Sequence, residues 1–144
     1  MTTIERSALV RFSAKDMFSL VADIESYPHF LPWCQSSRIL STEDSIVKAE
    51  LEIARGGFHK QFSTQNVNLE PNEIKLTLLN GPFKSLNGAW QFIPLNDHAS
   101  KISLKLEFEL SGGIAAIAFG RIFQQICETM VDAFHQRAKD LYGV

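Results

Sequence analysis

The chain has 144 residues and a mass of 16.2 kDa, a length typical of one domain with its own hydrophobic core. Its formal net charge is −2 and its lysines and arginines are scattered, which argues against DNA binding through a bulk positive field. The N-terminus lacks the basic and apolar regions of a signal peptide, and the longest apolar run, Ile114–Phe119, is too short to span a bilayer.

These features predict one domain over residues 1–144, located in the cytoplasm and without a transmembrane segment. Any contact with the inner face of the membrane is expected to be transient. The two cysteines, Cys34 and Cys127, are expected to be buried, reduced thiols.

The start of the chain predicts a strand followed by a short helix. The strand is expected over about residues 2–12. Ser13 can cap the helix, and Asp16 stands three residues later, as in a capping box.

The string Tyr27–Cys34 then forms a loop of unusual composition. Pro28 and Pro32 each remove a backbone donor, which rules out a long helix or a central strand. Most of the other residues are large and apolar, whereas loops are normally polar. The loop therefore either packs as a lid on the core or forms the wall of a binding site.

The middle of the chain alternates apolar and polar residues, which predicts strands. The alternation is clearest over residues 47–54 and 101–110. Turn signals such as Arg55-Gly56-Gly57 separate neighbouring segments. Tight links and one polar face are typical of an antiparallel sheet. The seven predicted strands cover about residues 2–12, 34–43, 47–54, 58–69, 73–80, 86–95 and 101–110.

A long amphipathic helix is predicted from Ile114 to Tyr142, where Gly143 can end it. Its apolar face should pack across the concave side of a curved sheet, which gives an α+β fold. Arg137 lies in the middle of that face. Either its stem packs while its guanidinium reaches solvent, or it is a buried cation paired with a carboxylate or a ligand oxygen. The apolar face is expected to contain Phe119, Ile122, Phe123, Ile126, Met130, Ala133, Phe134 and Leu141.

A search for catalytic residues yields no set that argues for an enzyme. The four histidines show no metal-ligand spacing with one another or with the cysteines, and no phosphate-binding or dinucleotide-binding motif occurs. The nearness of Cys34 to His29 is a weak signal for a thiol nucleophile. We expect no enzymatic activity, no metal and no cofactor.

Three blocks of the sequence, Val21–Cys34, Asn80–Phe92 and Ala133–Ala138, resemble the coenzyme Q-binding branch of the START-like, polyketide cyclase-related superfamily. They follow the order of that family, and the similarity covers nearly the whole chain. The resemblance implies a helix-grip fold, in which a curved seven-stranded antiparallel sheet surrounds a long C-terminal helix.

The resemblance implies two different functions. The first is binding of a hydrophobic isoprenoid ligand, above all ubiquinone, in an internal cavity in support of respiration. The alternative is that of the ribosome-association toxin, which binds the large ribosomal subunit and blocks subunit joining, so that translation initiation is inhibited; an antitoxin protein is then an expected partner. Basic residues available for such contacts on expected polar strand positions are Arg38, Lys48, Lys60, Lys101 and Lys105.

A lipid site in this family needs apolar walls and a few polar groups near the ligand's head. Phe83, near the tip of a turn, is expected to act as a gate opposite the proline loop. For each candidate, ordinary core packing is the competing interpretation. The expected ligand-binding residues are Tyr27, Phe30, Leu31, Trp33, Phe83, Leu86, Trp90, Phe119, Phe123, Ile126, Met130 and Arg137.

Overall fold

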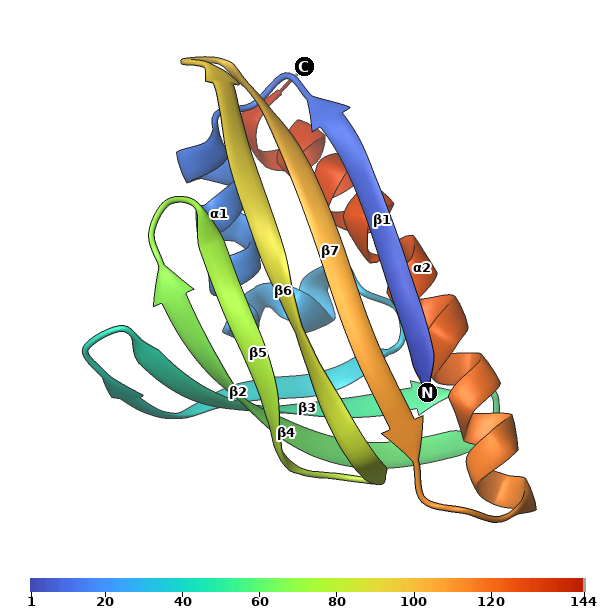
Figure 1. The fold of residues 1–144 in the computed structure, drawn as a ribbon. Helices are drawn as coiled ribbons and strands as arrows, with labels where there is room; N and C mark the ends of the chain where they lie inside the picture. Colours follow the sequence, from blue (N-terminus) through green and yellow to red (C-terminus); the bar gives the residue numbers. More distant parts are fainter. Residues whose placement is uncertain (144) are drawn as a thin grey trace.

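One seven-stranded antiparallel sheet forms the body of the molecule (Figure 1). The computed structural model describes residues 1–143. The strands follow the spatial order β1-β7-β6-β5-β4-β3-β2, and the predicted antiparallel sheet is confirmed. Their bounds are β1 Thr2–Val10, β2 Cys34–Glu43, β3 Ile46–Arg55, β4 Phe58–Leu69, β5 Glu73–Asn80, β6 Phe83–Asn96 and β7 Ala99–Leu110.

The alternation along each strand separates the two faces of the sheet. In β7, Ile102, Leu104 and Leu106 are buried, whereas Lys101 and Lys105, at alternate positions, are exposed. This period of two is the one expected for a strand with one face on the core. The apolar residues of the sheet therefore gather on its concave face.

The sheet bends sharply, so that β2, β3 and β4 cross at a steep angle below β1, β6 and β7 (Figure 1). Gly88 of β6 lies where β6 and β7 approach each other closely. A Cβ atom at this position would lie 2.1 Å from the carbonyl oxygen of Lys105 and 2.9 Å from the Cα of Leu106. Only glycine fits so close a backbone approach.

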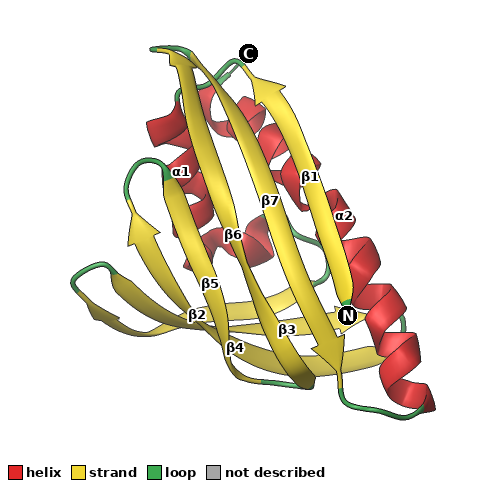
Figure 2. Cartoon of the chain, in the orientation of Figure 1, coloured by secondary structure: helices red, strands yellow, loops and turns green. Residues whose placement is uncertain are grey.

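Three helical segments lie on the same side of the sheet (Figure 2). They are α1 (Ala14–Ala22), the 3₁₀ helix η1 (Ile24–His29) and α2 (Ile114–Tyr142). Ser13 caps α1 as predicted, because its side chain accepts a hydrogen bond from the backbone N–H of Asp16 at 3.1 Å. Within residues 1–143, no helix is both long and apolar enough to cross a membrane.

Two details of the helices differ from the sequence-based expectations. Part of the proline-rich string is regular, because η1 continues through Pro28 to His29. Proline is compatible with so short a helix, since few of its N–H groups need an internal partner. Leu141 was expected on the buried face of α2 but is 52% exposed, because it lies in the last turn of the helix.

Aromatic rings fill the space between α2 and the sheet in two clusters. In the first, Phe134 of α2 is fully buried, and its ring centroid lies 5.2–5.4 Å from those of Tyr27, Phe30 and Trp90. The second cluster lies towards the N-terminal end of α2 and joins Phe62, Phe83, Phe108, Phe119 and Phe123.

Candidate functional site

An internal cavity of about 80 Å³ lies between the concave face of the sheet, the α1–η1 segment and α2. Every strand except β1 and β2 contributes to its walls. The volume is well below the ~300–1,000 Å³ of sites that hold drug-sized ligands, so a bulky ligand would require the walls to move apart. The lining residues are Val21, Ala22, Ile24, Tyr27, Trp33, Ala49, Leu51, Phe62, Thr64, Asn66, Asn68, Ile74, Leu76, Leu86, Trp90, Leu104, Leu106, Phe123, Ile126, Cys127 and Met130.

The cavity walls are mainly apolar, and none of their side chains carries a formal charge. Three of the polar side chains on the walls come from alternate positions of β4, namely Thr64, Asn66 and Asn68. The Thr64 hydroxyl donates to the Asn66 carboxamide oxygen at 2.8 Å. This contact occupies the acceptor end of Asn66 and leaves its NH₂ group as a donor.

Trp33, which also lines the cavity, carries an unpaired polar atom. Its indole Nε1 is buried and has no hydrogen-bond partner among the residues that the structure describes. Buried polar groups are almost always paired, so each unpaired one needs an explanation. The side chain contributes to the cavity wall, but its Nε1 atom does not face the cavity space.

The proline loop is held in place by backbone and side-chain hydrogen bonds. The backbone N–H of Ala54 in β3 donates to the Trp33 carbonyl at 2.9 Å. The Tyr27 hydroxyl donates to the Val21 carbonyl near the end of α1. Burial, with smaller effects from Cys34 and Asp23, raises the pKa of Tyr27, so its hydroxyl stays protonated and able to donate. Both expectations for the loop therefore hold in part: it covers the core, and Tyr27 and Trp33 also line the cavity.

Arg137 packs against the proline loop and does not line the cavity. Its guanidinium carbon lies 4.9 Å from the centroid of the Phe30 ring, a cation–π arrangement. Its Nε is buried without a hydrogen-bond partner, and among residues 1–143 no carboxylate forms an ion pair with it. Arg137 thus fits neither expectation fully: it is partly buried, and it contacts an aromatic ring where a carboxylate was expected.

The structure brings together seven of the twelve candidate ligand residues. Tyr27, Trp33, Leu86, Trp90, Phe123, Ile126 and Met130 line the cavity, whereas Phe30, Leu31, Phe83, Phe119 and Arg137 do not. The expectation that Phe83 forms a gate is wrong. Phe83 is 6% exposed, and its ring centroid lies 4.8 Å from that of Phe123 within the second aromatic cluster.

Sequence reasoning missed the polar residues of β4. Because Phe62 is buried on the inner face, the period of two also places Thr64, Asn66 and Asn68 on that face. The even spacing of these three residues from Phe62 was the signal in the sequence that could have placed them on the inner face. It was obscured because polar residues in an alternating strand are normally assigned to the solvent face.

The two thiols are poorly suited to nucleophilic chemistry. Burial, with a smaller contribution from the Glu52 carboxylate, raises the pKa of Cys34 to about 11, and burial also raises the pKa of Cys127. A thiol reacts as the thiolate, which is scarce at neutral pH when the pKa is this high. In the described part of the chain, no group of three or more His, Cys, Asp or Glu side chains could hold a metal ion.

A surface groove adjoins one end of the cavity and shares Ala22 and Asn68 with it. The groove lies between the C-terminal part of α1 and the β2–β3 hairpin. Its ionisable side chains are the three acids Asp23, Asp44 and Glu70, and no cation lines it.

Comparison with known proteins places the chain among helix-grip proteins of several functions. Residues 10–135 match the family described as "Polyketide cyclase / dehydrase and lipid transport". Among curated proteins, the ribosome association toxin RatA of Pseudomonas aeruginosa is 46% identical over 99% of both chains, and RatA of Escherichia coli is 42% identical over 99% of this chain and 90% of that protein. The mitochondrial coenzyme Q-binding protein COQ10 homolog B of Xenopus laevis is more distant, at 26% identity over 95% of this chain and 58% of that protein.

Solved structures confirm the fold class. A START superfamily protein from Mycobacterium smegmatis has a TM-score of 0.81 at 21% identity and covers 96% of this chain and 98% of its own. The Zhui aromatase/cyclase from Streptomyces has a TM-score of 0.84 at 15% identity and covers 96% and 93%. Likeness at these identities extends to the fold alone, since one fold hosts many functions.

Proposed function

This chain belongs to the polyketide cyclase/dehydrase and lipid transport family, and from that premise we propose that it associates with the large ribosomal subunit and hinders the joining of the two subunits. The observation that carries the proposal is the full-length match, at 46% identity, to a protein named ribosome association toxin. The order of the two functions expected from the sequence is thereby reversed, because the coenzyme Q-binding relative is much more distant.

Gradient sedimentation of bacterial lysates tests this proposal. After induced expression of the chain, we expect free subunits to accumulate at the expense of joined ribosomes, and growth to slow. The purified protein should also sediment with isolated large subunits and remain unbound in the presence of small subunits alone.

Leu104→Asp provides a matched control. Leu104 is 1% exposed, and an unpaired carboxylate in its place should prevent folding. The rest of the amino-acid sequence stays the same. After expression of this variant, the sedimentation profile should match that of cells without induction. Unchanged profiles with the native chain at high expression would overturn the ribosomal proposal.

The cavity supports a second proposed function, the binding of an apolar ligand. Its walls are uncharged and mostly hydrophobic, and each CH₂ group buried there contributes about 0.8 kcal/mol. The sequence-based candidate, ubiquinone or a similar isoprenoid lipid, is larger than a cavity of about 80 Å³, so the proline loop or α1 would have to move to admit it.

Mass spectrometry of lipids that co-purify with the native protein tests this second function. We expect an uncharged isoprenoid or other apolar molecule with the native chain, and its loss in Met130→Asp, because Met130 lines the cavity but is only partly buried, so the fold should survive. A native preparation that carries no lipid and takes none up from added quinone would contradict it.

A further inference from the structure

The first two turns of α2 are apolar on the side that faces solvent as well as on the side that faces the core. Ile114 is 87% exposed and Ile117 is 63% exposed, whereas Phe119 is buried in the second aromatic cluster. From Arg121 to Asp140, by contrast, every exposed residue of α2 is polar or charged. A helix that is hydrophobic all round is normally buried, so the start of α2 lacks a partner. Its exposed residues, here called the apolar tip, are Ile114, Ala115, Ile117 and Ala118.

Two neighbouring turns join the apolar tip at this end of the molecule. The β3–β4 turn packs on α2, since the ring centroids of Phe58 and Phe119 lie 5.7 Å apart. The β5–β6 turn leads into Phe83, which pairs with Leu110 at the end of β7.

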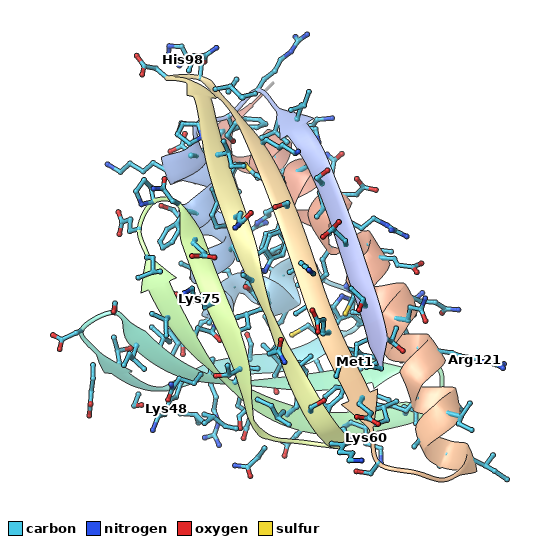
Figure 3. All side chains as sticks on the ribbon, in the orientation of Figure 1. Met1, Lys48, Lys60, Lys75, His98 and Arg121 are labelled. Carbon is cyan, nitrogen blue, oxygen red and sulfur yellow. The ribbon has the colours of Figure 1, made fainter. Side chains whose placement is uncertain are left out.

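Acidic side chains are scarce around the apolar tip. The charged residues within residues 55–60, 80–84 and 109–121 are four cations and one acid, namely Arg55, Lys60, Lys84, Arg121 and Glu109. Lys84 lies 3.9 Å from Glu109, and the other three cations form no ion pair within residues 1–143. In Figure 3, Lys60 and Arg121 lie at the end of the molecule where α2 begins, and His98 lies at the opposite end. The tip is therefore apolar and bordered by positive charge, although the whole chain has a net charge of −2.

The acidic groove lies at the other ends of β3 and β4. Its Asp44 stands just before the start of β3, and its Glu70 follows the end of β4. An anionic partner is thus attracted by the end that carries the apolar tip and repelled by the end that carries the groove. A second copy of this chain that docked tip to tip would bring like charges together, which is unfavourable. The charge distribution therefore favours an anionic partner for the tip.

We propose that the apolar tip is the surface through which this chain contacts the large ribosomal subunit. Ile114, Ile117 and Arg121 are spaced at i, i+3 and i+7, so they share one face of α2 and can reach one partner surface together. The two isoleucines enter an apolar recess, while Arg121 and Lys60 pair with RNA phosphates beside it. The inference rests on the proposed ribosomal function and specifies its contact surface. An anionic lipid surface carries the same charge, but the match to a protein named for ribosome association favours the ribosome.

Co-sedimentation of purified variants with isolated bacterial large subunits, at one fixed salt concentration, tests the proposal. The double variant Ile114→Ser/Ile117→Ser removes both exposed apolar side chains and adds no charge. We expect its affinity for the large subunit to fall at least about tenfold, because burial of one isoleucine side chain already contributes about that much. Arg121→Glu should lower the affinity by about threefold or more, since it replaces a phosphate partner with a like charge. All three residues are exposed, so the urea midpoint should stay at its native value.

Leu9→Ser/Leu95→Ser is the matched control. Leu9 and Leu95 are 70% and 55% exposed, and both lie towards the β6–β7 hairpin, at the opposite end of these strands from the apolar tip. This variant should change the affinity for the large subunit by less than about twofold.

Three results would count against the proposal in different ways. Large-subunit binding by Ile114→Ser/Ile117→Ser that equals native binding, or that falls no further than in the control, would overturn the inference and leave the ribosomal function intact. Binding of the native chain to vesicles that contain phosphatidylglycerol, lost in the tip variant while large-subunit binding stays unchanged, would assign the tip to a lipid surface and also overturn it. A native chain that does not bind large subunits would instead remove the proposed ribosomal function, and the inference with it.

Discussion

Ser100 ties β7 to the segment that leads into α1. Its side chain is fully buried, and its hydroxyl donates to the Phe12 carbonyl at 2.9 Å. Ser100→Ala removes the donor and leaves a buried carbonyl short of a partner, so we expect the free energy of unfolding in urea to fall by about 1–3 kcal/mol. Ser7→Ala, at an exposed position of β1, should change it by less than about 0.5 kcal/mol. Equal effects of the two substitutions would show that the Ser100 hydrogen bond does not stabilise this corner.

Cys34 should make stability depend on alkaline pH. Its thiol pKa rises from 9.0 to about 11 on folding, chiefly through burial. Between these values the unfolded thiol ionises while the folded one keeps its proton, so the unfolded state is favoured as pH rises. The free energy of unfolding should therefore fall from about pH 9 to about pH 11, by at most about 1.4 kcal/mol per pH unit and less after solvent screening.

Urea unfolding of Cys34→Ala over the same pH range provides the check. The decline should become shallower than in the native chain without vanishing, because burial also raises the pKa of Cys127 and of Tyr27. Identical pH slopes in the two proteins would contradict the assignment to Cys34.

Arg137 gives a prediction about the contact between α2 and the proline loop. Arg137→Met preserves an apolar stem but removes the cation over Phe30, so we expect a loss of about 0.5–1 kcal/mol in thermal or urea unfolding. Arg137→Ala should cost more, since it also removes the packing of the stem. A neutral or stabilising Arg137→Met would show that the unpaired buried Nε costs as much as the cation–π contact contributes.

At the level of single residues, the sequence predicted apolar positions better than polar ones. Trp33, Trp90 and Phe123 all line the cavity, as predicted, because large apolar side chains are buried away from water on the concave side of the sheet. The inward position of Asn66 and the missing hydrogen-bond partner of the Trp33 Nε1 were not predicted. A local sequence pattern does not reveal which polar atoms lack a partner. Phe83 was misassigned because a turn tip in sequence is not necessarily at the surface of a bent sheet.

At the scale of elements, β6 and β7 depend on Gly88. An alanine there would place its Cβ 2.1 Å from the Lys105 carbonyl oxygen, and neither backbone can move away without breaking the strand pairing. We expect Gly88→Ala to cost about 3 kcal/mol or more, or to prevent folding, as measured by soluble yield and the urea midpoint. Gly112→Ala is the control, because a Cβ there meets nothing within 4 Å, and its effect should stay within about 0.5 kcal/mol. A Gly88→Ala protein as stable as the control would contradict the close approach of the two strands.

The elements themselves were largely predictable. β2, β4 and β5 begin and end at the predicted residues, and α2 spans its predicted length, because alternation, turn residues and the terminal glycine all agree. The exception is η1, because Pro28 and Pro32 excluded a long helix and no short helix was predicted there. A curved sheet was expected from the long amphipathic helix, but the place of its bend was not, since the Gly88 approach and the strand bulges involve pairs of residues distant in sequence.

At the scale of the whole molecule, charge is dispersed. The labelled cations Lys48, Lys60, Lys75 and Arg121 lie on four different elements in Figure 3. Several other cations are paired with acids across neighbouring elements, such as Arg38 with Glu50 at 3.0 Å. A surface of this kind, with a formal net charge of −2, does not create the bulk positive field that drives non-specific binding to RNA.

The proposed contact with the large ribosomal subunit should therefore depend only weakly on salt. A protein that neutralises six to ten phosphates loses roughly 10³–10⁵ in affinity between about 50 and about 200 mM salt. For this chain we expect a loss of less than about tenfold, measured by sedimentation with isolated large subunits at several salt concentrations, because few of its cations can act together. Lys60→Glu on β4 and Lys101→Glu on β7 reverse two exposed lysines that form no ion pair within residues 1–143. If a local basic surface is used, one of these variants should weaken binding and flatten the salt dependence while the other leaves both unchanged. A steep salt dependence that neither variant alters would contradict binding through a small, local contact surface.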